Sequence, residues 1–208
     1  SKTISSDFKK EGSIIVLVGE QDLKGMGGST YLDVILNNET MQQLNNIPHV
    51  DLKNLPRILN ALYQAIQTSR ILSCHDISEG GLITSIFEMC VGADMGAQIH
   101  LEGVASQHLP GGTERSEFAC LTSVDRMDSW KVERPDYFLF NETPGCFIVE
   151  LENEKIAKKL FKNIPYLILG KTTKEKNITV RQKNKTLFTE KLEELKKVWQ
   201  EPMRKIFG

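Results

Sequence analysis

The chain has 208 residues, of which 40% are hydrophobic and 25% are charged, and its formal net charge is -1. This length can bury a substantial core, and the composition is ordinary for a globular protein. A net charge close to zero gives no overall field that would recruit nucleic acid, and no apolar run approaches membrane-spanning length. We therefore expect a soluble cytoplasmic protein that binds neither nucleic acid nor a membrane, and the sequence shows no signal-peptide pattern.

The charge is distributed unevenly along the chain. Residues 1–150 hold 11 basic and 20 acidic side chains, whereas residues 151–208 hold 15 basic and 7 acidic ones. Solvated lysine faces are the ordinary explanation of such a difference. A basic face that docks on an acidic neighbouring domain is the alternative.

The four cysteines show no metal-binding or redox spacing. Cys74, Cys90, Cys120 and Cys146 form no C-x-x-C pair, and three of them stand within apolar runs, as buried thiols do. The four histidines also lack metal-ligand spacing. The pattern indicates a reducing compartment and no zinc site.

The first elements are a strand and a glycine-rich loop. Residues 13–18 predict a buried strand that ends at Gly19. Gly25 to Tyr31 follows, in which glycines permit positive φ angles and Ser29 can cap a short helix. The loop either lies near a phosphate or is a plain connection between a strand and a helix.

An amphipathic helix follows a turn-rich stretch. Asp51 is expected to be its N-cap, and Pro56 falls in the early turns, where proline costs least. One stripe of apolar residues predicts a core-facing helix. Its members are Leu52, Leu55, Ile58, Leu59, Leu62 and Ile66.

The most informative stretch is His75 to Leu82, which reads His-Asp-Ile-Ser-Glu-Gly-Gly-Leu. A short apolar run at 71–74 predicts a strand before it. Apolar residues at 82, 83, 86, 87, 90 and 91 predict a helix after it, which Gly92 is expected to end. The order is therefore strand, tight polar turn and helix.

This turn combines glycines with possible acceptors for the N–H groups of the helix start. Asp76 or Ser78 could accept these hydrogen bonds, while Gly80 and Gly81 would let the backbone approach another group closely. A helix start favours anions, but Asp76 and Glu79 already place negative charge there. A bound phosphate would then need a divalent cation. The alternative is an acidic N-cap with two packing glycines.

The middle of the chain contains a second polar turn. Ala97 to Leu101 predicts a strand, and residues 103–136 suggest a surface excursion in which Phe118 to Leu121 could form a helical turn. Glu142 stands on a turn before a strong strand at 146–151, where a carboxylate can be held but exposed. A plain surface turn is the alternative.

The last part of the chain alternates helices with strands. Asn153 is expected to cap a helix, and Tyr166 to Leu169 predicts a strand. Apolar pairs on either side of Asn184 predict a hairpin, and a last helix carries Leu192 to Met203. Antiparallel pairs mixed with helices indicate an α+β fold with a mixed sheet.

At this point the motifs resemble a known family, phosphoribosylformylglycinamidine synthase. The shared motifs occur in the family's order, and they are Gly27-Gly28-Ser29-x-Tyr31, His75-Asp76-x-Ser78-x-Gly80-Gly81-Leu82, Leu139-Phe140-Asn141-Glu142-Thr143 and Leu192-x-x-Leu195-x-x-x-Trp199. The resemblance covers nearly the whole chain except residues 103–134, which look like an insertion. It implies that residues 1–208 form a single C-terminal synthetase-type domain, a fragment of a longer enzyme in the aminoimidazole ribonucleotide synthetase superfamily.

The resemblance also implies an activity for the whole enzyme. ATP would activate the amide oxygen of formylglycinamide ribonucleotide as an iminophosphate, and ammonia from a glutaminase partner would displace the phosphate. Magnesium would screen the triphosphate. The remaining domains of the same enzyme would be the other partners. The resemblance assigns no catalytic residue to this domain, which is expected to be inactive alone.

Ten residues are candidates to face a nucleotide or a domain interface, and Asp76 is also a candidate metal contact. They are Gly27, Gly28, Ser29, His75, Asp76, Ser78, Glu79, Gly80, Gly81 and Glu142. Two alternatives stay open. The chain could belong to another ATP-using relative (aminoimidazole ribonucleotide synthetase, selenophosphate synthetase or the hydrogenase-maturation type), or it could be a non-catalytic module that binds a partner or a structural nucleotide.

Overall fold

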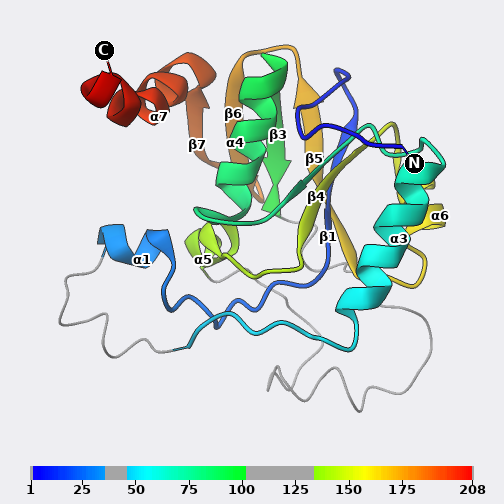
Figure 1. Ribbon diagram of the computed structural model, residues 1–208. Helices are drawn as coiled ribbons and strands as arrows, with labels where there is room; N and C mark the ends of the chain where they lie inside the picture. The colour runs from blue at the N-terminus through cyan, green and yellow to red at the C-terminus, as the bar shows by residue number, and fades with distance from the viewer. Residues whose placement is uncertain (1, 36–45, 102–133, 208) are drawn as a thin grey trace.

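The sheet and its helices are built from three stretches of the chain. The computed structural model describes residues 2–35, 46–101 and 134–207 (Figure 1). The strands are β1 Ile14–Val18, β2 Ser73–Asp76, β3 Gly96–His100, β4 Phe147–Leu151, β5 Tyr166–Thr173, β6 Asn177–Gln182 and β7 Lys185–Lys191. The helices are α1 Thr30–Ile35, α3 Leu55–Gln67, α4 Gly81–Ala93, α5 Pro135–Phe140, α6 Glu154–Leu160 and α7 Leu192–Phe207.

The seven strands form one mixed sheet in the order β2-β4-β1-β5-β3-β6-β7. Every neighbouring pair is antiparallel except β3 and β6, which run parallel. The expected α+β class with a mixed sheet is therefore confirmed. The expected hairpin is also confirmed, because β6 pairs with β7 on either side of Lys183, a residue with a positive φ of 53°.

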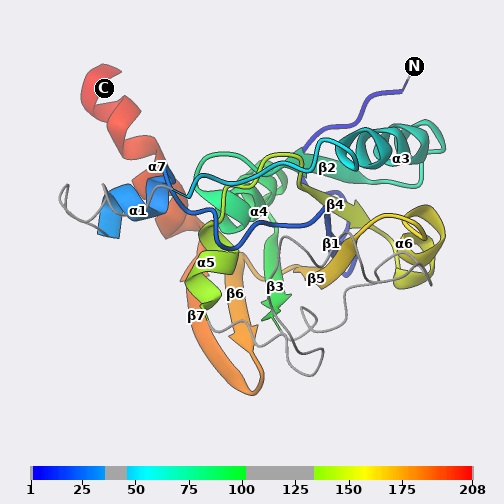
Figure 2. The ribbon, with the colours of Figure 1, turned by 90° about the horizontal axis from the view of Figure 1, so that it is seen from below.

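Strand β1 is covered on both faces. Ile15 and Leu17 point into one hydrophobic cluster and Val16 and Val18 into the other, as the alternation of a strand requires. The first cluster contains the apolar side of α4 and α5, and the second contains α3 and α6. Helices thus pack on both faces of this half of the sheet, while α4 lies across β3 and β6 (Figures 1 and 2).

Helix α3 differs from its expectation at the N-terminus. The helix begins at Leu55, and Asp51 instead accepts from the backbone N–H of Lys53 at 2.9 Å, within the preceding turn. Leu62 is buried as expected, but Leu52 is 76% exposed because it precedes the helix. Leu59 is also exposed because it lies about 100° around the axis from the buried face.

The elements beside the central turn differ from their expected bounds: β2 lies two residues later than the expected strand at 71–74, and α4 is longer than expected. Strand β2 runs from Ser73 to Asp76, since its pairing with β4 continues to the Asp76–Phe147 pair. Helix α4 does not end at Gly92. It continues to Ala93, and Asp94 takes the left-handed conformation with a φ of 55°.

Gly92 has a packing role instead. A Cβ atom at this residue would lie 2.7 Å from the Cβ of Asp7. The glycine therefore lets the N-terminal segment, residues 2–13, lie against α4.

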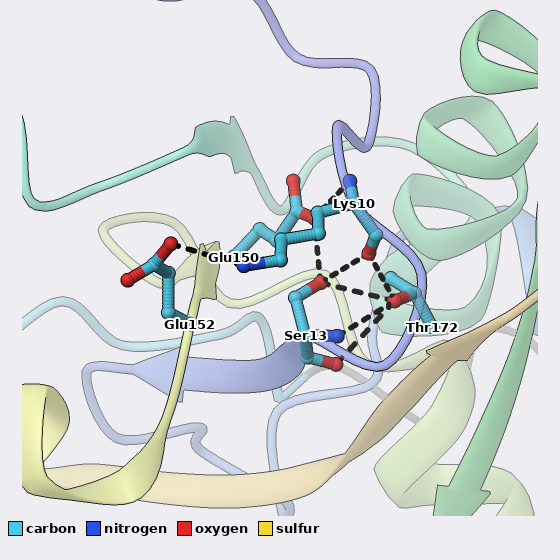
Figure 3. A network of polar contacts seen from close by, with 5 residues as sticks. All are labelled: Lys10, Ser13, Glu150, Glu152 and Thr172. Carbon is cyan, nitrogen blue, oxygen red and sulfur yellow. Dashed lines mark hydrogen bonds and ion pairs between the residues drawn. The ribbon is translucent and has the colours of Figure 1, made fainter.

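A buried carboxylate fastens the N-terminal segment to the sheet. Glu150 of β4 is 0% exposed and accepts four hydrogen bonds. The backbone N–H of Lys9 and the hydroxyl of Ser73 donate to Oε2, both at 2.8 Å. The backbone N–H of Lys10 (3.0 Å) and the hydroxyl of Ser13 (2.5 Å) donate to Oε1 (Figure 3). Such complete pairing is what a buried carboxylate requires.

The same segment contacts several other elements. Thr172 of β5 donates to the carbonyl of Lys10 at 2.6 Å and accepts from the backbone N–H of Ser13 at 3.1 Å (Figure 3). The backbone N–H of Phe8 donates to the carbonyl of Met89 in α4 at 3.2 Å. The N-terminal segment therefore joins β4, β5 and α4.

Helix α7 is partly detached from the domain. Leu192 is buried and Trp199 packs edge-on against Phe87 of α4, with ring centroids 6.2 Å apart. Beyond this contact, Met203 is 60% exposed and Ile206 is 71% exposed, and the helix extends away from the sheet in both views (Figures 1 and 2). Across the described part of the chain, no helix has the length and apolarity to cross a membrane.

The expected excursion at 103–134 lies almost wholly outside the described residues, as do Cys120 and the helical turn expected at Phe118 to Leu121. Asn153 is confirmed as the cap of α6, since its side chain accepts from the backbone N–H of Ile156 at 3.2 Å.

Candidate functional site

One carboxylate joins the starts of two helices. Glu142 Oε1 accepts from the backbone N–H of Thr30, the first residue of α1, at 3.0 Å. The same oxygen accepts from the backbone N–H of Gly80, which immediately precedes α4, at 2.7 Å. The glycine-rich loop and the central turn therefore meet at Glu142.

The loop that carries Glu142 is itself firmly held. Asn141 is 0% exposed, and its Nδ2 donates to the carbonyls of Asp22 at 2.8 Å and Gly25 at 3.1 Å. Its Oδ1 accepts from the backbone N–H of Thr143 at 3.0 Å. The Thr143 hydroxyl donates to Asn141 Oδ1 and accepts from the backbone N–H of Asp22 at 2.9 Å. These bonds fix the loop after β1 against the loop before β4.

Gly81 allows α4 to start directly against α5. Its φ is +72°, and a Cβ atom there would lie 2.5 Å from the carbonyl carbon of Phe140 and 2.8 Å from the carbonyl oxygen of Asn141. Both neighbours are backbone atoms that cannot rotate away. The expectation that this glycine permits a close backbone approach is confirmed by the contact with Phe140.

The expected capping by Asp76 or Ser78 is wrong. The N-cap of α4 is Gly80, with a φ of 78° and no side-chain cap. Because β2 continues through Asp76, the carboxylate of that residue projects into solvent and is 66% exposed. Ser78 contributes its carbonyl, which accepts from the backbone N–H of Gly81 at 3.0 Å. Glu142, which lies 62 residues further along the chain, supplies the acceptor for Gly80.

His75 lies between β2 and α4. Its Nδ1 is 2.7 Å from the carbonyl oxygen of Asp76, and its Nε2 is 3.1 Å from a carboxylate oxygen of Glu88 in α4. Both ring nitrogens therefore contact protein acceptors. This placement gives His75 a role in attaching α4 to the strand that leads into the turn.

The backbone of the glycine-rich loop surrounds the buried hydroxyl of Ser29. Ser29 is 1% exposed, and its Oγ accepts from the backbone N–H of Leu32 at 3.4 Å, which confirms it as the cap of α1. The backbone N–H of Gly27 donates to the carbonyl of Asn46 at 2.8 Å. Gly28 has a φ of +76°, with open space where a side chain would begin.

The acidic residues of the turn lie at the surface. Glu79 is exposed beside the start of α4, and Asp76 lines an open groove of about 710 Å³ together with Ile77, Pro144 and Phe147. Among the residues that the structure describes, no group of three or more His, Cys, Asp or Glu side chains could hold a metal ion. Within that part of the chain, the Asp76 carboxylate lies at the surface outside any such group.

A second, smaller hollow lies on the other side of the Thr143–Gly145 turn. Its volume is about 170 Å³, and its lining includes Glu20, Asp22 and Asp51. Burial raises the pKa of the Glu20 carboxyl, and the nearby charge of Asp51 raises it further. Pro144 and Gly145 line both hollows, so the loop after Glu142 separates them.

Helix α1 is attached to α5 through Tyr31. The Tyr31 ring stacks on Phe140 with centroids 4.7 Å apart and planes 7° apart, and its hydroxyl donates to Asp136 Oδ2 at 2.8 Å. Arg134 donates to both oxygens of Asp136, at 3.0 Å and 2.6 Å. The guanidinium, followed by the Tyr31 hydroxyl, lowers the pKa of the Asp136 carboxyl to about 2.

The structure therefore adds residues that sequence reasoning did not select. Asn141, Thr143 and Asp136 all act through hydrogen bonds to partners at least 100 residues away, at Asp22, Gly25 and Tyr31. No local sequence pattern predicts hydrogen-bond partners that lie so far apart in the chain. The signal that existed was the polar run Asn141-Glu142-Thr143 between two apolar stretches.

Comparison with known proteins places these features in a family. Residues 10–183 match the family described as AIR synthase related protein, C-terminal domain. The phosphoribosylformylglycinamidine synthase subunit PurL of Aquifex aeolicus is 26% identical over 213 aligned residues, which cover 100% of this chain and 24% of that protein. The chain thus spans about a quarter of the length of the curated relatives that it matches.

Solved structures show the same fold. Thermotoga maritima PurL complexed with FGAR has a TM-score of 0.69 at 16% identity, and the match covers 92% of this chain and 29% of that one. The same protein complexed with ATP has a TM-score of 0.59 at 14% identity, covering 92% and 27%. The family match spans most of the chain, including the Glu142 site. The chain therefore belongs to the family of AIR synthase related proteins, as the C-terminal domain of that family.

Proposed function

We propose that the chain is the C-terminal domain of a PurL-type synthetase, which converts formylglycinamide ribonucleotide to formylglycinamidine ribonucleotide with ATP and ammonia. The observation that carries this proposal is the alignment of the whole chain with one quarter of PurL, with the three motifs gathered around Glu142. The chain shares its fold with the solved structures of PurL complexed with FGAR and with ATP. Residues 1–208 would form this one domain of a longer enzyme.

The role of this chain in such an enzyme is to hold two helix starts in fixed positions. Glu142 sets the backbone at Thr30 and Gly80, and Gly81 brings α4 against α5. Backbone N–H groups and glycines at helix starts are suited to phosphate-bearing ligands. Here both of these N–H groups already donate to a carboxylate, so the two helix starts serve as a rigid platform.

A divalent cation would have to arrive with the nucleotide. Magnesium in nucleotide sites is bound by phosphates, water and one or two carboxylates. The described residues provide isolated carboxylates and no cage, which fits that mode alone. Asp76, which lies at the end of β2 and lines the open groove, is the carboxylate we assign to such a contact.

The partners would be the rest of the synthetase and a glutaminase that supplies ammonia. Exposed apolar side chains support a contact with further domains. On α7, Val198 is 68% exposed and Phe207 is 78% exposed, and on α1 Val34 is 79% exposed. Large apolar side chains grouped on one helix, as on α7, are typical of an interaction surface. We place the enzyme in the cytoplasm, where purine nucleotides are made.

The experiment is an assay of this chain with and without the rest of a synthetase. The pure 208-residue chain should show no ATP-dependent conversion of formylglycinamide ribonucleotide with ammonium. A PurL chain from which the matched quarter has been removed should also be inactive, and mixing or fusing the two should restore formation of product. Turnover by the isolated chain, or no recovery in either combination, would count against the proposal.

A pure interaction module is the second candidate, and the exposed apolar side of α7 favours it. The two functions separate in a titration of the restored enzyme with magnesium and ATP. Under our proposal Asp76→Asn weakens magnesium-dependent nucleotide binding and leaves folding intact. A module without a nucleotide-facing role would show the same affinity in wild type and variant.

A further inference from the structure

We propose that the hydrogen bond between Tyr31 and Asp136 is a latch that holds the start of α1 on Glu142. Tyr31 and Asp136 are then positioning residues of the candidate site. The latch follows from the contacts of α1 alone, while its importance for nucleotide binding rests on the function proposed above.

Helix α1 has few other attachments. It spans six residues, of which Leu32 is its one buried residue, and Val34 and Ile35 are exposed. Helices this short are not stable by themselves in water. The position of α1 therefore depends on the contacts of Tyr31 and Leu32 and on the bond from Thr30 to Glu142.

Tyr31 is held at both its ring and its hydroxyl. The ring lies flat on Phe140, and the hydroxyl donates to a carboxylate that Arg134 fixes from its other side. The guanidinium of Arg134 also lies 4.1 Å above the ring of Tyr137, in the same helix α5 as Asp136. A hydrogen bond to a charged, doubly anchored acceptor is stronger than an average one.

The latch is connected to the site through Thr30 and Phe140. Thr30 precedes Tyr31 directly, so any rotation of the Tyr31 backbone moves the N–H that points at Glu142. Phe140, which supports the ring, is also the residue whose backbone lies against Gly81. The latch and the start of α4 thus share the end of α5 as their support.

The experiment measures amide hydrogen exchange at Thr30 and at Val16 in the 208-residue chain. Tyr31→Phe keeps the stacked ring and removes the hydroxyl, whereas Asp136→Asn keeps the shape and removes the charge. Both should accelerate exchange at Thr30 by about tenfold or more, as loss of a hydrogen bond to a charged group does. Exchange at Val16, in the centre of the sheet, should accelerate much less than exchange at Thr30, because it follows only the small change in global stability.

Tyr63→Phe is the matched control, because Tyr63 is 54% exposed on α3, away from the site. It should change exchange at neither amide. The proposal is overturned if both latch variants leave exchange at Thr30 unchanged, or if exchange at Thr30 and at Val16 accelerates by the same factor, which would mean a general loss of stability. Arg134→Gln provides a milder variant that should accelerate Thr30 less than Asp136→Asn does.

Magnesium–ATP binding to the restored synthetase is measured separately. If the wild-type enzyme binds no nucleotide, the proposed function is wrong. The latch is then still tested by the exchange data alone. If the wild type binds and the exchange at Thr30 responds as expected, both latch variants should weaken binding more than Tyr63→Phe does.

Discussion

Glu142 and Glu150, at the two ends of residues 142–150, have contrasting environments. Glu150 is 0% exposed, and each of its carboxylate oxygens accepts two hydrogen bonds, from the N-terminal segment and from β2. Glu142 is half-buried, and both of the hydrogen bonds it accepts from described residues go to Oε1. Among the described residues, hydrogen bonds therefore reach both oxygens of Glu150 and one oxygen of Glu142.

This difference separates a structural group from a candidate functional one. A buried carboxylate with every lone pair satisfied has no capacity left for a ligand, and its removal leaves donors without partners. A carboxylate that joins two helix starts through a single oxygen keeps its second oxygen for another contact. Position in the sequence does not distinguish the two, but the number and direction of their donors does.

The largest effect is expected for Glu150→Gln. The backbone N–H groups of Lys9 and Lys10 point at different oxygens, so either orientation of the amide places its NH₂ group against an N–H that cannot turn away. Unfolding free energy should fall by about 2–4 kcal/mol, since a buried charged acceptor is lost and a donor is left unpaired. Urea denaturation monitored by circular dichroism measures this loss.

The control is Glu152→Gln, two residues further along. Glu152 pairs with Lys10 Nζ at 3.1 Å, and the side chains of this pair are 48% and 60% exposed. An exposed ion pair of this kind contributes little, so the variant should stay within about 0.5 kcal/mol of wild type. Equal losses in the two variants would show that burial does not determine the cost.

The next largest effect is a difference in stability between alanine variants of two glycines that share one backbone conformation. Gly81 has a φ of +72° and Gly28 a φ of +76°, so alanine costs about 1–2 kcal/mol of left-handed strain at either position. At Gly81 the new Cβ also meets backbone atoms of Phe140 and Asn141, whereas at Gly28 it meets nothing within 4 Å. Gly81→Ala should therefore destabilise by about 1–3 kcal/mol more than Gly28→Ala does.

Thermal and urea unfolding of the two alanine variants measure that difference. Nearly equal stabilities would mean that α4 and α5 can move apart without cost. In that case Gly81 would be required for its φ angle alone.

These residues also show how far the sequence could be followed. The strand at 13–18, the helix after the central turn and the hairpin around Asn184 rest on local periodicity, and all three are present. The same reasoning placed Glu142 among the candidates. It failed where partners are distant, as for the acceptor of the Gly80 N–H at the start of α4, which is 62 positions away.

Glu150 was overlooked although a signal existed. It is the single charged residue of the strand Phe-Ile-Val-Glu-Leu, and the residues before and after it, Val149 and Leu151, are buried. A charge at a position buried on both faces of a sheet needs partners, so the composition of that strand predicts a polar network. The identity of the donors, which come from residues 9 to 73, could not be read from the strand itself.

A smaller and pH-dependent effect is expected at Asp136. The pKa of its carboxyl falls from 3.8 to about 2 on folding, chiefly through Arg134 and further through Tyr31. A carboxyl with a lowered pKa contributes stability above its unfolded value, and that contribution is lost as the pH falls through the folded value. Solvent screening limits the contribution to about 1 kcal/mol.

Comparison of wild type with Asp136→Asn in urea at several pH values tests this sign. The stability difference should be constant from pH 7 to about pH 4 and should shrink between pH 4 and pH 2. A difference that grows on acidification would mean that the aspartate is not held as an anion beside Arg134.

The smallest change in stability is expected for Glu142→Gln. A glutamine can turn its single carbonyl oxygen toward both Thr30 and Gly80, because both N–H groups share one acceptor atom. The loss of charge should lower unfolding free energy by about 0.5–1 kcal/mol, well below the loss at Glu150. In the restored synthetase, the same variant should alter magnesium–ATP affinity, because the second carboxylate oxygen becomes an NH₂ group. A loss of stability as large as that of Glu150→Gln, with unchanged nucleotide affinity, would make Glu142 a second structural carboxylate and remove the contrast between the two.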